Sequence, residues 1–357
     1  MTANPEARSA RTAALPGVGA GGVARLAEAR VLVLGAGGLG SPVIQYLAAT
    51  GIGTLGIVDF DTVDRTNLQR QVIHSASDVG RLKTESAAEA VASTNDSVTV
   101  IQHPIRLEPG NALGLFADYD VIVDGTDNFA TRYLANDAAA ILQKPYVWGS
   151  VLQFDGEVTV FHETGDASAI DYRDLHPVPP PPDTVLSCAD GGVLGSLCGT
   201  IGTWMASEVV KLITGVGVPL IGRMLHVDAL SGDVDTIPLR RAPGREPVRE
   251  LLGDYLAFCG TNDAGASEYG LTFESLPPRD TITLVDVREP AEHAGGHLPG
   301  DILIPLGDLL ASPNVNAASP VVFYCETDAR SRVACAASRA VGVDARFLVG
   351  GIRASRR

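Results

Sequence analysis

Residues 31–40 read VLVLGAGGLG, an apolar run that passes directly into a glycine-rich turn. A continuous apolar run of this length is typical of a strand buried in a parallel sheet. Glycines in such a turn let the backbone approach a phosphate, and the N-terminus of a following helix favours negative charge. The sequence therefore predicts a nucleotide site at this strand–helix junction. Its glycines are Gly35, Gly37, Gly38 and Gly40.

Strand and helix patterns alternate after this turn. Four further segments have the apolar character of strands, and helical patterns lie between several of them. The alternation predicts a doubly wound, mostly parallel, Rossmann-like α/β sheet. The four segments are LGIVDFD (55–61), VTVIQHPIRL (98–107), DYDVIVDGTDN (118–128) and PYVWGS (145–150).

The length of 357 residues suggests about two domains. We expect a nucleotide-binding domain over 1–245, a linker rich in glycine, proline and polar residues over 246–275, and a small α/β domain over 276–357. The small domain shows few helical patterns before residue 316. In the first domain, the segment HPVPPPPD (176–183) predicts an extended crossover loop, and 225–239 resembles a β-hairpin.

The chain has 42 acidic and 27 basic residues, a net charge of −15. Residues 276–357 carry nine of each sign, so the excess lies in residues 1–275. Such a surface argues against nucleic-acid binding and suits either a partner with a basic face or solubility alone. The N-terminal residues lack the apolar segment of a signal peptide, no apolar run is long enough to span a membrane, and the cysteines are too few for a disulfide scaffold. We therefore expect a cytoplasmic protein that does not enter membranes.

Charged residues beyond the turn discriminate between two nucleotides. Asp59 follows Gly35 at a spacing that suits a carboxylate bonded to ribose hydroxyls, which fits NAD as well as ATP. Arg70 and Lys83 come next, and cleavage of a phosphate chain needs such cations, whereas hydride transfer does not. Asp127 stands at the end of an apolar strand, where an acidic side chain can hold Mg²⁺. These residues favour ATP, with an NAD-dependent oxidoreductase as an alternative.

Four segments together resemble one family. GAGGLGSP, VDFDTVDRTNLQRQVIH, VGRLK and DGTDNFATRY are similar to the ubiquitin-activating-like adenylyltransferases of the MoeB/ThiF type. The C-terminal part, with VDVREP, GHLPG and FYC, resembles a single-domain rhodanese. The chain as a whole is thus similar to the family members in which a rhodanese follows the adenylyltransferase.

This resemblance assigns a role to each matching residue. One glycine contacts phosphate, one carboxylate holds the ribose, three polar or basic side chains hold the triphosphate, and an acidic residue binds Mg²⁺ beside an asparagine. In that order they are Gly38, Asp59, the trio Asn67, Arg70 and Lys83, then Asp127 and Asn128.

The family also has an arginine finger that reaches the site from the other subunit, within an R-Y-S-R-H motif near the N-terminus. Here residues 8–12 read RSART, which lacks the aromatic residue and the histidine. Arg11 is the candidate finger. The role implies a homodimer.

Two cysteines are candidates for sulfur chemistry. Cys188 lies just past the proline-rich loop, where the family carries a cysteine implicated in thioester or acyl-disulfide chemistry; the alternative is a small core residue. Cys325 follows an apolar strand and precedes a helix, so backbone N–H groups would hold its thiolate or persulfide. We expect Cys198 in the core and assign no role to Cys259.

Many relatives bind structural zinc with two C-x-x-C pairs, which this chain lacks. The place of the first pair carries Asp171 and Asp174, and the place of the second carries Arg245 and Arg249. We therefore expect no structural zinc. Instead, the two carboxylates should face one of the two arginines in solvent-exposed ion pairs, which contribute only about 0–1 kcal/mol each.

The rhodanese loop also departs from the family. Glu326 and Asp328 replace the usual lysine and glycine, and two acids beside a thiolate oppose its formation. Aspartate tolerates the left-handed backbone that glycine adopts, so the loop can still form. Arg330 adds positive charge, and the final helix after residue 350 is short.

The resemblance implies an enzyme with adenylyltransferase and sulfurtransferase activities. It would adenylylate the C-terminal glycine of a ubiquitin-like sulfur-carrier protein ending in Gly-Gly, using ATP and Mg²⁺, and then form the carrier thiocarboxylate. Sulfur would come from a persulfide donor such as a cysteine desulfurase or from thiosulfate, and the product would feed pathways such as molybdenum cofactor biosynthesis. An adenylylation-only activator with a degenerate rhodanese domain is the alternative.

Overall fold

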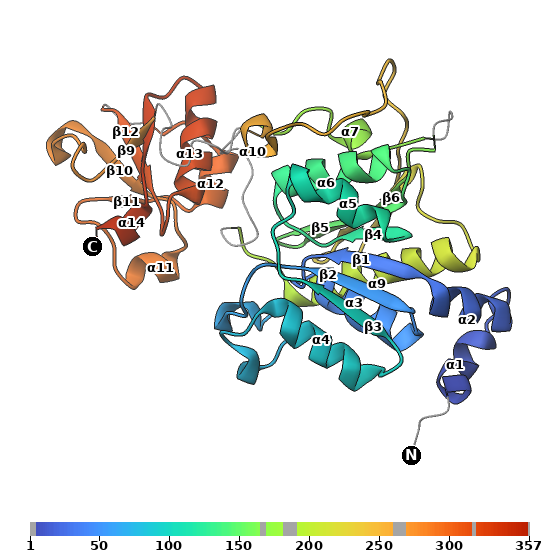
Figure 1. The fold of residues 1–357 in the computed structure, drawn as a ribbon. Helices are drawn as coiled ribbons and strands as arrows, with labels where there is room; N and C mark the ends of the chain where they lie inside the picture. Colours follow the sequence, from blue (N-terminus) through green and yellow to red (C-terminus); the bar gives the residue numbers. More distant parts are fainter. Residues whose placement is uncertain (1–4, 165–168, 181–190, 260–268, 316–318, 356–357) are drawn as a thin grey trace. The chain divides into compact units, whose positions relative to one another are not determined.

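The computed structural model describes residues 5–164, 169–180, 191–259, 269–315 and 319–355. The chain divides into two compact units. The first unit holds Met1–Val178 and Val193–Tyr255, and the second holds Pro179–Gly192 and Leu256–Arg357. Each unit has its own sheet and its own core (Figure 1).

The first unit is built on an eight-stranded sheet with the order β3-β2-β1-β4-β5-β6-β7-β8. The strands from β3 to β5 in this order run parallel, and β6, β7 and β8 are antiparallel to their neighbours. The predicted doubly wound, mostly parallel sheet is therefore confirmed, and so is the predicted hairpin, formed by β7 and β8. The strands are β1 (Arg30–Leu34), β2 (Thr54–Val58), β3 (Thr99–His103), β4 (Val121–Asp124), β5 (Tyr146–Leu152), β6 (Asp155–Phe161), β7 (Arg223–Asp228) and β8 (Val234–Pro238).

Helices cover both faces of this sheet. In Figure 1, α3 and α4 lie on one side and α5 and α6 on the other, while α9 packs along α3 and contacts β5 and β6. No helix in the described part of the chain is both long and apolar enough to span a membrane. The helices are α1 (Pro5–Ala13), α2 (Gly19–Glu28), α3 (Gly40–Thr50), α4 (Lys83–Thr94), α5 (Pro109–Ala117), α6 (Phe129–Ile141), α7 (Tyr172–Leu175) and α9 (Gly195–Thr214), with 3₁₀ turns η1 (Arg65–Asn67) and η2 (Ala76–Asp78).

The predicted nucleotide site lies at a switch point of the sheet. β1 pairs with β2 on one side and with β4 on the other, all in parallel. The glycine-rich turn follows β1, Asp59 follows β2, and Asp127 lies in the turn after β4. All three therefore lie at the same edge, formed by the carboxyl ends of the strands, where open α/β sheets bind their ligands.

Backbone segments approach each other very closely at this edge. Gly35 has a φ of +86°, a conformation that favours glycine. A Cβ atom on Gly40 would lie 1.8 Å from the carbonyl oxygen of Gly35, and one on Gly125 would lie 2.9 Å from the nitrogen of Gly40. The turns after β1 and β4 and the start of α3 therefore meet with no side chain between them.

The second unit contains a five-stranded parallel sheet with the order β11-β10-β12-β13-β9. Cys325 directly follows the central strand β12 and precedes α13. β9 lies within the segment 246–275 that we expected to be a linker, yet it pairs with β13. The elements are β9 (Gly270–Leu271), β10 (Thr283–Asp286), β11 (Ile302–Leu303), β12 (Val321–Tyr324), β13 (Ala345–Leu348), α11 (Pro290–Ala294), α12 (Leu306–Ala311), α13 (Ala329–Ala340), α14 (Gly351–Ala354) and η3 (Arg279–Thr281), and α10 (Tyr255–Phe258) stands where the two units divide.

The stretch before residue 316, where we expected few helices, contains two short α-helices. Both α11 and α12 lie in that stretch, with five and six residues respectively. Helices this short carry too few residues to show a helical period, and packing rather than local propensity stabilises them. The shortened final helix is present as α14, with four residues.

Gly40→Ala is expected to destabilise the first unit by at least about 3 kcal/mol, because the new methyl group would overlap a backbone carbonyl. That carbonyl cannot move without separating β1 from α3. Both tryptophans, Trp148 and Trp204, lie in the first unit, so their fluorescence during urea unfolding reports on this unit. The unfolding midpoint is the measurement.

Gly114→Ala is the matched control. Gly114 lies on an exposed part of α5, and a Cβ there would have no neighbour within 4 Å. The substitution should raise stability slightly, by about 0.4–1 kcal/mol. A Gly40→Ala protein as stable as the wild type would contradict the close backbone approach.

Candidate active sites

The glycine-rich turn is held through both backbone groups of Ala36. Asp59 Oδ2 accepts a hydrogen bond from the Ala36 N–H at 2.9 Å. His74 Nε2 lies 3.0 Å from the Ala36 carbonyl, which can only accept, so Nε2 carries the proton and Nδ1 accepts from the Ser86 hydroxyl at 2.8 Å. Burial lowers the pKa of His74, and the charge of Lys83 lowers it further. The imidazole is therefore neutral at neutral pH.

Lys83 places a buried cation beside Asp59. Its Nζ lies 3.0 Å from Asp61 Oδ2 and 3.9 Å from Asp59 Oδ2. Burial raises the pKa of Asp59, and Lys83 opposes that increase. Because Asp61 is exposed, the closest partner of Lys83 can be replaced by another anion without a large rearrangement.

Arg70 and Gln71 lie along the turn itself. A Cβ on Gly38 would lie 3.5 Å from Cγ and Cδ of Arg70, so the guanidinium begins one bond beyond atoms that line the turn. In the described part of the chain, no carboxylate pairs with Arg70. The amide of Gln71 lies against Gly37, and its buried Oε1 has no hydrogen-bond partner among the described residues. Cys198 is buried under Gly38, which confirms the prediction that it belongs to the core.

The turn after β4 carries one exposed and one buried carboxylate. Asp127 is exposed, as a carboxylate that binds a metal at this edge would be. Asp124 is fully buried, and burial raises its pKa although it accepts a hydrogen bond from Tyr146. Asn128 caps α6 by accepting from the Thr131 N–H at 2.9 Å. Its side-chain oxygen is therefore committed to the helix.

Two functional residues were missed by sequence reasoning, His74 and Arg132. The Arg132 guanidinium is buried, donates to the Thr126 carbonyl at 3.0 Å and to the Ser150 hydroxyl at 3.2 Å, and lies over the ring of Trp148. It thus fixes the turn after β4 against β5. The available signal was weak, because each residue is a single polar position within a longer motif to which we had already assigned a role.

The remaining predicted residues are placed differently. Arg11 is exposed on α1, and it has no ion-pair partner among the residues that the structure describes. Asn67 Oδ1 accepts from the Asp64 N–H at 3.2 Å as part of a turn. Cys188 lies outside the described residues. The structure thus gathers the glycine-rich turn, Asp59, Arg70 and Lys83 at one edge of the sheet.

A second group of charges occupies the position where relatives are expected to hold zinc. Arg245 donates to Asp171 at 2.6 Å, to Asp174 at 2.7 Å and to Glu163 at 2.7 Å. The predicted pairing of the two aspartates with an arginine is confirmed, and Arg245 is the partner, whereas Arg249 is exposed. The prediction that such pairs would be exposed was wrong.

Because the side chains of this cluster are buried, their ion pairs differ in energy from the exposed pairs that we expected. The exposed fractions of the side chains are 8% for Arg245, 5% for Glu163, 2% for Asp171 and 1% for Asp174. Burial raises the pKa of Asp171 to about 6, although Arg245 opposes this. Burial also acts to raise the pKa of Glu163, but the hydrogen bonds from its arginine partners outweigh it and lower that pKa. Removing the cation would leave buried carboxylates without a counter-charge.

In the second unit, Cys325 is buried with its Sγ 3.8 Å from the hydroxyl of Ser331. Glu326 next to it is paired on both oxygens, with Arg288 Nη1 at 3.1 Å and with Arg353 Nε at 3.1 Å. These two cations offset the negative charge that we expected to oppose a thiolate.

Asp328 also differs from its expected role. Its φ is −155°, so the loop forms without a left-handed backbone at this position. Its Oδ2 accepts from the Gly350 N–H at 3.1 Å and lies 3.3 Å from Arg332 Nη2. Arg330, expected to add positive charge, is paired with both oxygens of Glu292 at 2.7 Å. The charges of this loop are thus balanced locally.

Comparison with known proteins finds two families. The ThiF family matches residues 9–248, and the Rhodanese-like domain matches residues 273–356. The chain is 48% identical to the probable adenylyltransferase/sulfurtransferase MoeZ of Mycobacterium tuberculosis over 360 residues, which cover 97% of this chain and 91% of that protein. It is 47% identical to the sulfur carrier protein adenylyltransferase of Thermus thermophilus over 254 residues, covering 69% of this chain and 93% of that protein.

Solved structures share the fold of the first unit at lower identity. The crystal structure of E. coli MccB with ATP is similar with a TM-score of 0.55 and 20% identity, covering 63% of this chain and 68% of that chain. At this identity the likeness concerns the fold alone.

Arg245→Met is expected to lower the free energy of unfolding of the first unit by about 3–5 kcal/mol near neutral pH, because it leaves buried carboxylates unpaired. The loss should shrink as the pH falls toward about 5, since a protonated carboxyl group needs no cation. Asp171 is the first to respond, because its pKa is already raised to about 6. Urea unfolding followed by tryptophan fluorescence at several pH values measures both effects.

Arg249→Met is the control for this substitution. It removes the same charge from an exposed site without a carboxylate partner in the described ranges, so stability should change by less than about 0.5 kcal/mol. Equal losses in the two variants would show that net charge, rather than the buried cluster, is responsible.

Proposed function

Because the chain belongs to the ThiF family and continues into a rhodanese-like domain, we propose that it activates a ubiquitin-like sulfur-carrier protein with ATP and then transfers sulfur to it. The observation that carries this proposal is the edge of the first sheet, where the glycine-rich turn lies beside Arg70 and the chain also brings Lys83 next to Asp59. An NAD-dependent enzyme would use the same turn but would leave both cations without a role. The names of the relatives, adenylyltransferases and sulfurtransferases, support the same choice.

The residues at this edge fit a nucleoside triphosphate. Gln71 and Thr126 each have a buried polar atom without a partner among the described residues, and both lie against the turn. Each oxygen of Asp59 accepts one backbone N–H and retains capacity for a ribose hydroxyl. Asp127 would hold Mg²⁺, which supplies positive charge to the phosphates. The phosphate chain would contact the turn glycines, Gly38 foremost, and the side chains of Asn67, Arg70 and Lys83.

Adenylylation joins the carboxylate of the carrier's last glycine to the α-phosphorus of ATP. The new O–P bond forms as the bond to pyrophosphate breaks, and an acyl-adenylate results. The carboxylate is already ionised, so the protein supplies position and charge neutralisation rather than a base. Arg70 and Lys83 supply that charge within one chain, and Arg11 supplies it from the second chain of a homodimer.

Sulfur transfer then uses Cys325. Its persulfide attacks the acyl carbon, AMP leaves, and an acyl disulfide forms. A thiolate, from Cys188 or from an external thiol, attacks the sulfur of Cys325 and releases the carrier thiocarboxylate, and the resulting disulfide is reduced by a further thiol. The persulfide is supplied by a cysteine desulfurase or by thiosulfate, and molybdenum cofactor biosynthesis is one pathway that would consume the product.

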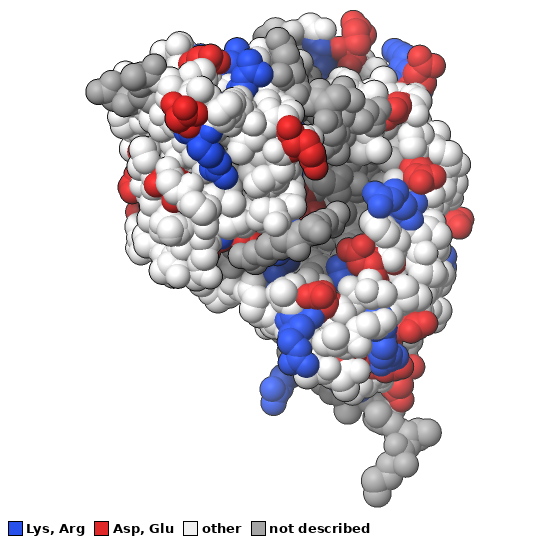
Figure 2. All heavy atoms as spheres, turned by 90° about the vertical axis from the view of Figure 1, so that its left-hand side faces the viewer, with Lys and Arg blue, Asp and Glu red and all other residues white. Residues whose placement is uncertain are grey.

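The proposed division of labour follows the chain. Residues 1–245 carry adenylylation, 246–275 connect, and 276–357 carry sulfur, a division that the family matches at 9–248 and 273–356 support. No structural zinc is needed in the first domain, because Arg245 fills that place. On the face drawn in Figure 2, basic and acidic side chains alternate and the described residues form no continuous basic surface, as expected of a protein that does not bind nucleic acid.

Exchange of labelled pyrophosphate into ATP tests the first activity. It should require a carrier protein that ends in Gly-Gly. Asp127→Ala should abolish exchange and spare thiosulfate:cyanide sulfurtransferase activity, whereas Cys325→Ala should do the reverse, because the two residues belong to separate units. Exchange without any carrier would contradict the proposal. A wild-type protein with exchange but no sulfurtransferase activity would favour the adenylylation-only alternative.

Mixing two inactive variants tests the role of Arg11. Arg11→Ala and Lys83→Ala should each abolish exchange alone. In a mixed dimer, the site with an intact Lys83 receives an intact Arg11 from its partner, so a co-refolded equimolar mixture should regain roughly a quarter of the wild-type rate. No recovery in a mixture that demonstrably contains mixed dimers would rule out a finger supplied from the second subunit.

A further inference from the structure

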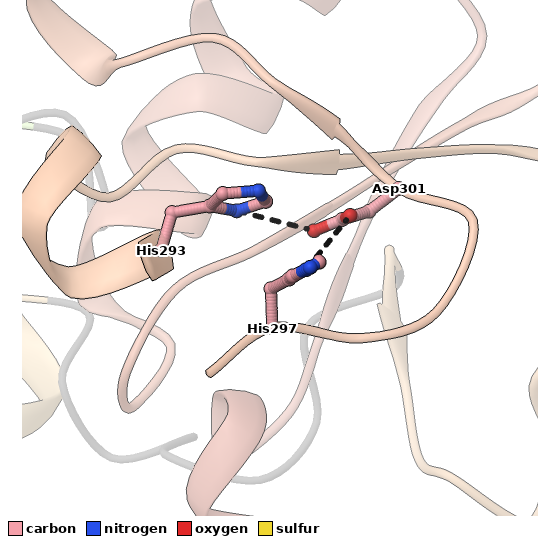
Figure 3. A group of neighbouring side chains, drawn as sticks. All are labelled: His293, His297 and Asp301. Atoms are coloured by element: carbon pink, nitrogen blue, oxygen red, sulfur yellow. Dashed lines mark ion pairs between the residues drawn. The ribbon is translucent and has the colours of Figure 1, made fainter. Parts of the chain in front are cut away.

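Three potential metal ligands converge in the second unit, and none of them is a residue used above. His293 lies near the end of α11, and His297 and Asp301 lie in the loop that leads to β11. One ligand atom from each lies within 4.8 Å of the others. Figure 3 shows both imidazoles turned toward the Asp301 carboxylate, with Nδ1 of His293 and of His297 each 3.6 Å from one of its oxygens.

The carboxylate of this group is fixed before any ligand binds. Asp301 is 3% exposed and accepts a hydrogen bond from the hydroxyl of Tyr324. Tyr324 also accepts from the Leu298 N–H at 3.0 Å, so the same hydroxyl ties the loop to β12. A buried, anchored carboxylate loses little conformational entropy when it binds a cation.

A second carboxylate holds the ring of His293. Its Nδ1 lies 3.1 Å from Asp286 Oδ2, and Asp286 is in turn held by Arg288 through Nε and Nη2. Asp286 orients the imidazole, and a metal ion bound at Nδ1 together with Asp301 would replace the contact to Asp286. The two imidazole rings stack with centroids 4.1 Å apart, so both present their edges to the same small volume.

We propose that His293, His297 and Asp301 form an exchangeable binding site for a divalent transition-metal ion, Zn²⁺ foremost. Two imidazoles and one carboxylate are the donor set of open zinc sites, and they exclude the hard cations that prefer oxygen ligands alone. Bonds of about 2.0–2.1 Å would draw the ligand atoms to roughly 3.3 Å from one another. His297, 43% exposed, is free to make most of that movement and leaves a fourth position open to water.

The three ligands of this site take no part in the proposed activities and do not belong to the Arg245 cluster. The cluster replaces a structural zinc in the first unit, whereas the histidine site is in the second unit and its occupancy is not required for folding. Zinc bound by the full chain is therefore predicted to depend on the histidines and on no residue of the first unit.

Calorimetric titration of the full chain with ZnCl₂, after chelator treatment and removal of the chelator, tests the proposal. The wild type should bind one ion, and His293→Phe and His297→Ala should each weaken the affinity at least about tenfold. Co²⁺ in place of Zn²⁺ should give the visible absorption of a four-coordinate ion in the wild type and lose it in both variants. His226→Gln is the matched control, since it removes a histidine that lies near Asp155 and Glu157 in the first unit.

His297→Ala keeps the experiment informative if His293→Phe disturbs packing, because an exposed side chain is removed. Metal-free thermal unfolding verifies that each variant is folded. Absence of zinc binding by the wild type overturns the proposal. Zinc affinity that is unchanged in both histidine variants, or that is lost in His226→Gln, overturns it as well. Selective loss in the two histidine variants supports it.

Discussion

The nucleotide edge depends on the close approach of the Gly35 and Gly40 backbones, which leaves no room for a side chain on Gly40. Because their backbones meet directly, α3 starts against the end of β1, and the N-terminus of a helix favours negative charge. Asp59 accepts a hydrogen bond from the Ala36 N–H, and His74 donates one to the Ala36 carbonyl, so the turn is rigid before a ligand binds. Arg70 lies along this rigid backbone, and Lys83 lies beside Asp59, which is hydrogen-bonded to it. Both cations can neutralise a phosphate chain only because the turn would hold that chain in a fixed position beside them.

The sheet and the glycine-rich turn could be predicted from sequence because their signals lie in short segments of the chain. The apolar strands, the glycine-rich turn and Asp59 follow one another along the chain, so their periodicity and spacing predict the sheet and its switch point. Contacts between side chains from distant segments could not be predicted. Arg132 gains its meaning only when β5 brings Ser150 and Trp148 beside it, and His74 only when Ala36 lies next to Ser86. Asn128, which was predicted to lie beside the metal ligand, also caps α6, and the sequence alone did not indicate that second role.

Where acidic residues replace the family's usual residues, arginines from other segments pair with them. Aspartates stand where cysteines were expected, and Arg245 meets them; Glu326 stands where a lysine was expected, and Arg288 and Arg353 meet it. A substitution of this kind is stable only if the opposite charge is supplied from another segment. The pairing of the two aspartates with an arginine could be predicted because the family pattern brings both segments to one zinc site. Its burial could not be predicted, since burial depends on how β6, α7 and the segment around Arg245 pack.

The Arg245 cluster has a consequence for the conditions in which the protein can work. Thiolates that hold a zinc ion are nucleophilic, and peroxide converts them to sulfenic acids and disulfides, which releases the metal. A guanidinium bonded to carboxylates contains no atom that such oxidants attack. The first unit thus holds Glu163, Asp171 and Asp174 together with a group that is inert to such oxidants.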